Sequence, residues 1–345
     1  MYARLAQVLA SQGGLVTRGQ ALDCGLAPSR IRQLLDEGQL VWMLRSVYAD
    51  GEVHRALDEF RGLPKLRVRA VLLVKHRCWV LSHDSSALEL KMPLIDPRKS
   101  LVHLTRTGFG SAWTRAGVAH HYARFSPGQL LTSDEGFRHL SIARTAVDID
   151  REHGELAGLV ACDWALRQGV PRSDLIEAYL PMAHWPGVID ARAAVERADP
   201  RAESVAETLG RDLVEELGVG RVDAQFPFVV DGRVVWADLR VGNHVFEVHG
   251  KVKLVPVDEG GVAARPITEV VWEEKKRARL IRAEGVGLSD VLYEDFWGER
   301  RAAALKRLRA EYLVTEQRFG PQLHPRLAAQ AADLRARFGR RDRAG

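Results

Sequence analysis

Alternating apolar and polar residues near position 240 give the clearest secondary-structure signal in the chain. Residues 234–249 alternate on both sides of Gly242-Asn243, a pair that is typical of a two-residue hairpin turn. The antiparallel register set by this turn places Asp238 directly opposite Glu247, with Cβ atoms about 5 Å apart. Like charges in such a position destabilise a sheet, so we expect a compensating group, and a divalent cation is suited to that role.

The face that carries Glu247 continues along the second strand of this hairpin. Because side chains repeat every second residue, His249, Lys251 and Lys253 point to the same side, provided that Gly250 does not introduce a bulge. Two acids, one histidine and two lysines are therefore predicted on one surface. The solvent-exposed face of a half-covered sheet has the same pattern, so the hairpin alone does not establish a functional site.

The first 50 residues have a helical periodicity instead. Apolar stripes interrupted by glycines predict three short helices followed by a β-rich segment, which is the order of a winged helix-turn-helix. The third helix of that fold enters the DNA major groove. Small three-helix units also bind proteins, and helical spacing does not separate the two functions. The candidate DNA contacts lie on the third helix and where the second begins, and they are Thr17, Arg18, Ser29, Arg30, Arg32 and Gln33.

The rest of the chain mixes helical and strand-like stretches, which predicts a multidomain α/β protein. After the winged helix at 1–50 we expect an α/β middle domain at 51–150, a helical connector at 151–199, a second α/β domain at 200–297 and a basic helical tail at 298–345.

Histidines in the middle domain invite a catalytic interpretation. His83 is followed by Asp84, and His120 and His121 are adjacent. Isolated histidines in a mixed α/β region are usually hydrogen-bonded structural groups, so we assign no catalytic role to these four residues from the sequence.

Composition and charge narrow the class of protein. The chain has 345 residues, 46% hydrophobic and 28% charged, which is typical of a globular protein with two or three domains. Of the net charge of +5, the residues from 300 onwards contribute +8 through 12 Lys and Arg against 4 Asp and Glu. A basic C-terminal segment favours contact with nucleic acid, although a solvated helix has the same composition.

Cysteine usage and apolar runs indicate the compartment. The three cysteines, Cys24, Cys78 and Cys162, form neither a disulfide framework nor a zinc-ligand spacing. The longest apolar runs are far too short to span a bilayer, and no signal-peptide pattern is present. We therefore expect a cytoplasmic protein without a membrane partner.

A family resemblance covers the N-terminal segment. The sequence QGGLVTRGQALDCGLAPSRIRQLLDEGQLVWMLRSVYA, at 12–49, resembles the winged-helix domain of AbiEi-type antitoxins from type IV toxin–antitoxin systems. In that family the domain binds operator DNA. The resemblance implies DNA as a partner and leaves open a toxin or another defence-system protein as a second partner, and a homodimer.

A second resemblance covers residues 200–297. A helix, strands bearing Asp and then Glu, a helix and a final strand follow the αβββαβ order of the restriction-endonuclease-like, or PD-(D/E)xK, superfamily. The segments ADPRAES, WADL, EVHGKVKL and WEEKKRARLIRAEG resemble its very-short-patch-repair-like endonuclease branch. The resemblance implies that Asp238 and Glu247 hold Mg²⁺ or Mn²⁺ for phosphodiester hydrolysis. It also implies that Glu203 acts as an outer-sphere or second-metal carboxylate.

The sequence departs from that family at one catalytic position. A lysine normally follows the metal-binding Glu by two residues, and His249 stands there instead. His249 replaces the lysine, or Lys253 or Lys251 reaches the site from the same face, or Lys275 supplies the cation from the next helix. Of these alternatives we prefer Lys253. In a further alternative, cleavage has been lost and only DNA binding remains.

The expected function combines both resemblances. We predict a DNA-binding protein with a metal-dependent nuclease domain that hydrolyses DNA phosphodiester bonds, in defence, repair or mobile-element biology. Lys275, Arg277 and Arg282, together with Lys251, are expected to contact phosphates. The alternative is a non-catalytic transcriptional regulator or antitoxin with a degenerate nuclease fold.

Overall fold

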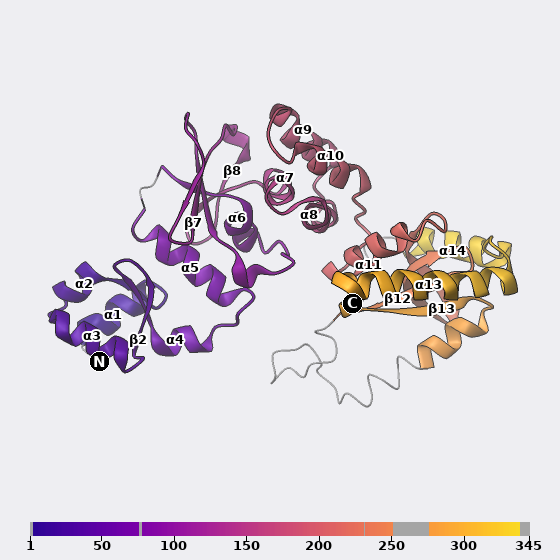
Figure 1. Ribbon diagram of the computed structural model, residues 1–345, viewed down its shortest axis with the longest axis horizontal. Helices are drawn as coiled ribbons and strands as arrows, with labels where there is room; N and C mark the ends of the chain where they lie inside the picture. Colours follow the sequence, from indigo (N-terminus) through magenta and orange to yellow (C-terminus); the bar gives the residue numbers. More distant parts are fainter. Residues whose placement is uncertain (1–2, 76–77, 231, 251–275, 339–345) are drawn as a thin grey trace. The chain divides into compact units, whose positions relative to one another are not determined.

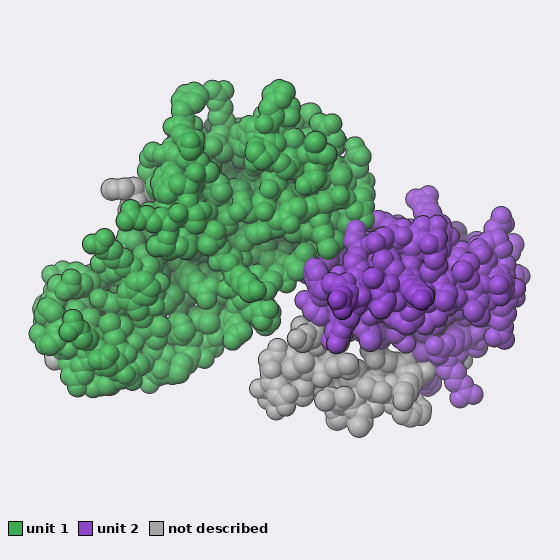
Figure 2. Space-filling model, in the orientation of Figure 1, with its two compact units in different colours: residues 1–198 green, residues 199–345 purple. Residues whose placement is uncertain are grey.

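The computed structural model describes residues 3–75, 78–230, 232–250 and 276–338 (Figure 1). The chain forms two compact units, 1–198 and 199–345 (Figure 2). Both units combine helices with a sheet, which confirms the predicted multidomain α/β class. Three predicted site residues, Lys251, Lys253 and Lys275, lie outside the described residues.

The first unit begins with the predicted winged helix. Its small sheet has the strand order β1-β3-β2, and the apolar stripes of its helices pack into one core with Leu5, Leu9, Ile31 and Leu34 fully buried. The elements are α1 (Ala3–Ser11), β1 (Leu15–Thr17), α2 (Arg18–Asp23), α3 (Pro28–Asp36), β2 (Leu40–Leu44) and β3 (Val47–Asp50).

A six-stranded sheet follows, with the order β6-β7-β5-β4-β9-β8. The neighbouring strands β5 and β7 are parallel, so a crossover separates them in sequence. The elements of this region are α4 (Gly51–Ala56), α5 (Gly62–Leu72), β4 (Val80–Leu81), α6 (His83–Leu90), η1 (Pro97–Lys99), β5 (Val102–Arg106), β6 (Trp113–Arg115), β7 (Val118–Tyr122), η2 (Pro127–Gln129), β8 (Leu130–Thr132) and β9 (Arg138–Leu140).

Helices complete the first unit and bury the largest set of apolar side chains in it. Helices α7 and α8 pack closely at Gly158, where an added Cβ would lie 1.7 Å from Asp150 Oδ2. Only glycine fits at that position. The elements are α7 (Ile142–His153), α8 (Glu155–Arg167), α9 (Arg172–Tyr179), η3 (Leu180–Met182) and α10 (Val188–Arg197).

The second unit is built on a four-stranded sheet with the order β10-β11-β12-β13. Strands β12 and β13 are parallel and the other neighbours are antiparallel. This is the αβββαβ element order expected from the sequence. The elements are α11 (Val205–Glu216), β10 (Asp223–Val230), β11 (Arg233–Val241), β12 (His244–His249), a helix at 276–283, β13 (Gly287–Leu292), η6 (Tyr293–Phe296), α13 (Gly298–Phe319) and α14 (Pro325–Arg337).

The basic C-terminal residues pair with acids of the same unit. Arg301 contacts Asp212 at 2.8 Å and Glu216 at 2.7 Å, and Arg335 contacts Asp223 at 2.9 Å. Helices α13 and α14 are thus part of the second unit's fold, and much of their positive charge is neutralised within it.

A buried histidine links the hairpin to α13. His244, 1% exposed, has Thr315 Oγ1 at 2.7 Å from Nδ1 and Ser289 Oγ at 2.8 Å from Nε2. Burial lowers its pKa from the ordinary 6.5 to about 4. The folded protein therefore keeps His244 neutral in a pH range where the unfolded chain takes up a proton.

We expect the second unit to lose stability as the pH falls from 6.5 towards 4. In that window the unfolded state binds more protons at His244, so the free energy of unfolding falls with decreasing pH, by at most about 3 kcal/mol from this residue. Urea unfolding of the protein and of a His244→Gln variant at several pH values measures the difference. An identical pH dependence in both proteins would contradict the assignment.

Candidate functional site

The β11–β12 hairpin has the register predicted from its turn. Val241 pairs with His244, Arg240 with Val245 and Leu239 with Phe246. These pairs extrapolate to Asp238 opposite Glu247.

Beyond the last of these pairs, Asp238 changes the local hydrogen bonding. Its Oδ2 accepts the backbone N–H of Val248 at 2.8 Å. Asp238 and Glu247 are 9% and 8% exposed, so two buried acids lie side by side on neighbouring strands.

A third acid, Glu207, lies next to Asp238. Its Oε2 accepts the backbone N–H of Glu203 at 2.9 Å and the side-chain amide of Gln225 at 2.8 Å. Burial, and then the charge of Asp238, raise the pKa of Glu207. The prediction named Glu203, but its side chain is exposed, and Glu207 is the buried acid in the first turn of α11. The sequence signal for Glu207 is its place three residues after the helix cap Ser204.

Arg277 neutralises one of these acids. Its guanidinium lies 3.0 Å from Glu247 Oε2 and also donates to the backbone carbonyl of Trp236. Arg277 was predicted to contact phosphates, and in the structure it contacts Glu247 instead. Arg282, from the same helix, is exposed.

His249 occupies the position where the nucleases that residues 200–297 were predicted to resemble have lysine. Its Nε2 lies 2.9 Å from Asp290 Oδ1, and this hydrogen bond is the main cause that lowers the pKa of Asp290. Strand β13 brings Asp290 beside Glu247 in parallel register. Asp290 was not predicted from the sequence, because only the β12–β13 pairing places it on this face.

The acidic side chains of this face offer oxygen atoms that could bind Mg²⁺ or Mn²⁺. Carboxylate oxygens are the ligands these ions prefer, and a cation would relieve the repulsion from Asp238 that, after burial, raises the pKa of Glu207. However, these acids do not form a compact set of ligands around one ion position. Arg277 already supplies a positive charge at Glu247. Among the described residues, one group of His, Cys or acidic side chains has its ligand atoms within 4.8 Å of one another. That group lies in the first unit and does not include the acids of this face.

The winged helix presents a second candidate surface. On α3, Ser29, Arg32 and Gln33 are exposed. Glu37 lies 3.6 Å from the guanidinium of Arg30 and accepts a hydrogen bond of 2.7 Å from Gln33. A phosphate or base edge therefore competes with Glu37 for Arg30 and Gln33, whereas Arg32 has no such contact with it.

The remaining predicted DNA contacts flank this helix. Thr17 caps α2, with its hydroxyl accepting the N–H of Gln20 at 3.2 Å, so its side chain has a structural role. Arg18 is exposed at the start of α2. Arg45, which the sequence analysis did not single out, is exposed at the β2–β3 wing.

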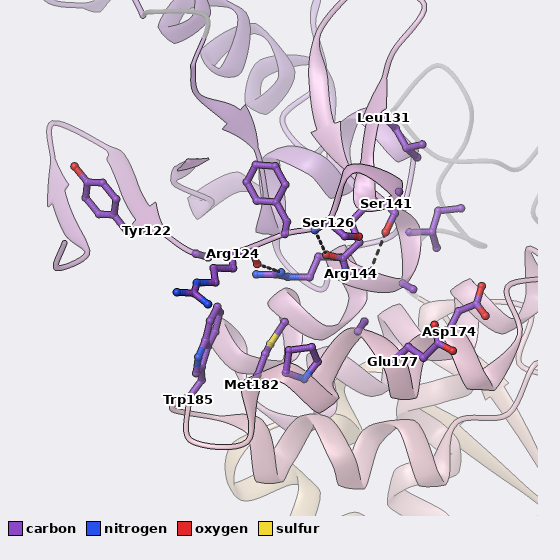
Figure 3. A pocket seen from close by; sticks show the side chains of 18 of the residues that line it. Tyr122, Arg124, Ser126, Leu131, Ser141, Arg144, Asp174, Glu177, Met182 and Trp185 are labelled. Carbon is purple, nitrogen blue, oxygen red and sulfur yellow. Dashed lines mark hydrogen bonds between the residues drawn. The ribbon is translucent and has the colours of Figure 1, made fainter. Parts of the chain in front are cut away.

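A hollow of about 1240 Å³ in the first unit contains none of the predicted site residues (Figure 3). Figure 3 shows Arg144 extending towards Arg124, whose backbone carbonyl it contacts at 3.0 Å. The guanidinium of Arg144 also binds Asp148 at 3.0 Å. Because Arg144 is held by these contacts, we assign it a structural role.

None of the helices described is both long and apolar enough to cross a membrane. No curated protein matches the chain. Residues 3–49, the segment that forms the winged helix, match the family described as transcriptional regulator, AbiEi antitoxin.

Proposed function

We propose that the protein binds duplex DNA through its winged helix and acts as a transcriptional regulator of the antitoxin type. The observation that supports this most is that the AbiEi match, at 3–49, coincides with a complete winged helix. Its α3 exposes Ser29, Arg32 and Gln33 on one helix, where a major groove would accommodate them.

The charges of this surface suit a DNA backbone as well as base edges. Arg18 and Arg45 are exposed on either side of α3 in sequence, and we expect them to contact phosphates, which fix the register of a protein on the duplex. Arg32 and Gln33 have the donor groups that recognise guanine and adenine in the major groove. Specificity is therefore assigned to α3 and general affinity to Arg18 and Arg45.

Replacing Arg32 with alanine is expected to weaken specific binding by about 1–3 kcal/mol, the range for a side chain that reads a base edge. The duplex is first selected from a random library with the wild-type protein, and affinity is then measured by fluorescence anisotropy. Arg4→Ala removes the same charge from an exposed position on α1 and is the control. Equal losses in both variants, or no duplex enriched by selection, would count against the proposal.

The second unit supports a second candidate function, metal-dependent hydrolysis of DNA. The observation in its favour is that Asp238 and Glu247 lie on neighbouring strands of a sheet of the expected strand order, and that Glu207 of α11 lies next to Asp238. When bound, the ion would polarise the phosphoryl group and activate water. Asp238 and Glu247 would hold it, and Glu247 would have to release Arg277. Incubation with duplex and single-stranded DNA in Mg²⁺ or Mn²⁺ tests for cleavage.

A toxin partner belongs to the same proposal. The matched family is named for an antitoxin, so we propose that a protein encoded beside this one co-purifies with it. Size-exclusion chromatography with light scattering determines whether the chain also forms a homodimer.

A further inference from the structure

Three histidines and one glutamate meet in the first unit, and none of them belongs to either surface described above. They are His83 at the start of α6, His103 on β5, His121 on β7 and Glu152 on α7. One ligand atom from each lies within 4.8 Å of those of the other three. Four separate elements therefore contribute one potential metal ligand each.

The strand register explains how the two strand histidines meet. In the parallel pair β5–β7, Thr105 lies opposite His121 and His103 lies two residues earlier on the same face. His103 Nδ1 and His121 Nε2 are 3.0 Å apart. Two nitrogens bound to one tetrahedral zinc ion are about 3.3 Å apart, so the distance is suitable. The ring centroids are 5.3 Å apart with an angle of 9° between the planes, so the two nitrogens point at each other and the rings would have to rotate to bind one ion.

An outer hydrogen bond orients His83. His83 Nδ1 lies 2.9 Å from Ser82 Oγ, which in turn accepts the hydroxyl of Thr105 at 2.7 Å. This leaves Nε2 of His83 as the nitrogen for an ion. Metal-binding histidines characteristically have such a partner on their other nitrogen.

The backbone at His83 is also unusual. Its φ is +45°, a left-handed conformation that costs a residue other than glycine of the order of 1–3 kcal/mol. Strain of this size persists where the surroundings fix a side chain in place, and here it directs His83 towards the rings of His103 and His121, at 4.9 and 4.2 Å between centroids.

We propose that His83, His103, His121 and Glu152 bind one divalent transition-metal ion of the zinc type. Three imidazoles and a carboxylate are a ligand set suited to Zn²⁺. Burial lowers the pKa of all three histidines and so favours the neutral imidazole, in which one of the two ring nitrogens carries no proton.

Some of the surrounding charges oppose the binding of a cation, and others favour it. Arg144 and Arg151 lie near His83 and oppose a cation. Both guanidiniums are bound by Asp148, at 3.0 and 3.4 Å, which offsets part of their charge. Without an ion, His103 and His121 would share one N–H···N hydrogen bond, and this metal-free arrangement is the competing explanation for their 3.0 Å contact.

The burial of the ligands indicates the role of the ion. His83 and His103 are 5% and 1% exposed, whereas Glu152 is exposed. The ion would lie at the edge of the core with its carboxylate ligand facing solvent. It would fasten α6 and α7 to the β5–β7 strands, and Glu152 is the ligand that water or another anion would displace.

The test uses the full-length protein with any affinity tag removed. Zn²⁺ binding is measured by equilibrium dialysis with elemental analysis, in excess Mg²⁺ so that carboxylate-only sites are occupied. The variants are His121→Ala and Glu152→Gln, and His120→Ala is the matched control. His120 is the neighbour of His121 on the opposite strand face, where its Nε2 lies 2.9 Å from Lys75 Nζ.

We expect one Zn²⁺ per chain in the wild type and in His120→Ala. Affinity should fall at least about 10-fold in Glu152→Gln and in His121→Ala, since even outer partners of a metal ligand are worth about 10–100-fold. Zn²⁺ should also raise the melting temperature of the wild type but not of His121→Ala. If His121→Ala fails to fold by circular dichroism, the exposed Glu152→Gln decides. A wild type without a zinc equivalent, or equal affinity in Glu152→Gln and His120→Ala, would overturn the proposal.

Discussion

Replacing Asp238 with asparagine is expected to abolish the proposed Mg²⁺- or Mn²⁺-dependent cleavage of DNA while the proposed duplex binding by the winged helix is retained. The amide keeps an oxygen to accept the N–H of Val248, now 2.8 Å from Asp238 Oδ2, so the hairpin keeps its hydrogen bond. What is lost is the charge that would hold the ion. Alanine would also leave a buried N–H unsatisfied, at a cost of about 1–3 kcal/mol, and would confuse catalysis with folding.

The expected loss of activity is large because the ion contributes several kcal/mol of charge stabilisation in the transition state. At about 1.36 kcal/mol for each factor of ten, cleavage should fall at least 100-fold, roughly the loss for a 2.7 kcal/mol rise in the barrier. Asp333→Asn makes the same charge change at an exposed position on α14 and is the control. The measurement is nicking of a labelled duplex at saturating metal.

Two results would remove the nuclease proposal and leave the DNA-binding proposal intact. One is undiminished cleavage in Asp238→Asn, and the other is no cleavage by the wild type under any condition. The second outcome would assign the Arg277–Glu247 contact at 3.0 Å a permanent structural role, with the guanidinium replacing a metal ion.

The hairpin was predictable from sequence because its register depends on one local feature. Once Gly242-Asn243 is taken as the turn, counting residues fixes every pair up to Leu239 and Phe246, as the structure confirms. The winged helix was predictable for a similar reason, since its caps and glycine stops lie within about 50 consecutive residues.

The choice between Glu203 and Glu207 was harder to make from the sequence. Both lie where α11 begins, and only the capping geometry at Ser204 and the contact with Gln225 show which one is buried. Gln225 has a φ of +52° inside β10, an irregularity that an alternation pattern does not reveal. Asp290 depends in the same way on a strand pairing between distant segments.

The histidine group of the first unit could not be predicted from the sequence. His83 and His121 were interpreted as isolated structural residues, and His103 was not considered. Their proximity depends on the parallel β5–β7 register and on where α6 begins. Neither feature leaves a local pattern.

Replacing Asp148 with alanine is expected to destabilise the first unit by about 3–5 kcal/mol, the usual cost of breaking a buried ion pair. Asp148 is fully buried and holds Arg144, itself 3% exposed, at 3.0 Å. Asp148 also lies 3.4 Å from Arg151. Burial lowers the pKa of Arg151, and the charge of Asp148 raises it. Removing the carboxylate leaves two guanidiniums near one another with less compensation.

Thermal unfolding measures this effect and separates it from a surface ion pair. For a unit of this size each kcal/mol shifts the melting temperature by about 2–4 °C, so Asp148→Ala should melt roughly 6–20 °C lower. Asp96→Ala breaks an exposed pair with Arg98, 2.8 Å long, and should cost less than about 1 kcal/mol.

The double variant Arg144→Met with Asp148→Leu distinguishes the cost of an unpaired charge from the value of the pair. Replacing both partners of a buried ion pair with apolar residues is often close to neutral, so the double variant should recover much of the stability lost in Asp148→Ala. Recovery will be incomplete, because Arg144 also donates to the carbonyl of Arg124 at 3.0 Å and Arg151 stays in place. A double variant less stable than Asp148→Ala would show instead that Arg144 stabilises the unit mainly through Arg124 and the ring of Trp185, 5.6 Å from its guanidinium carbon.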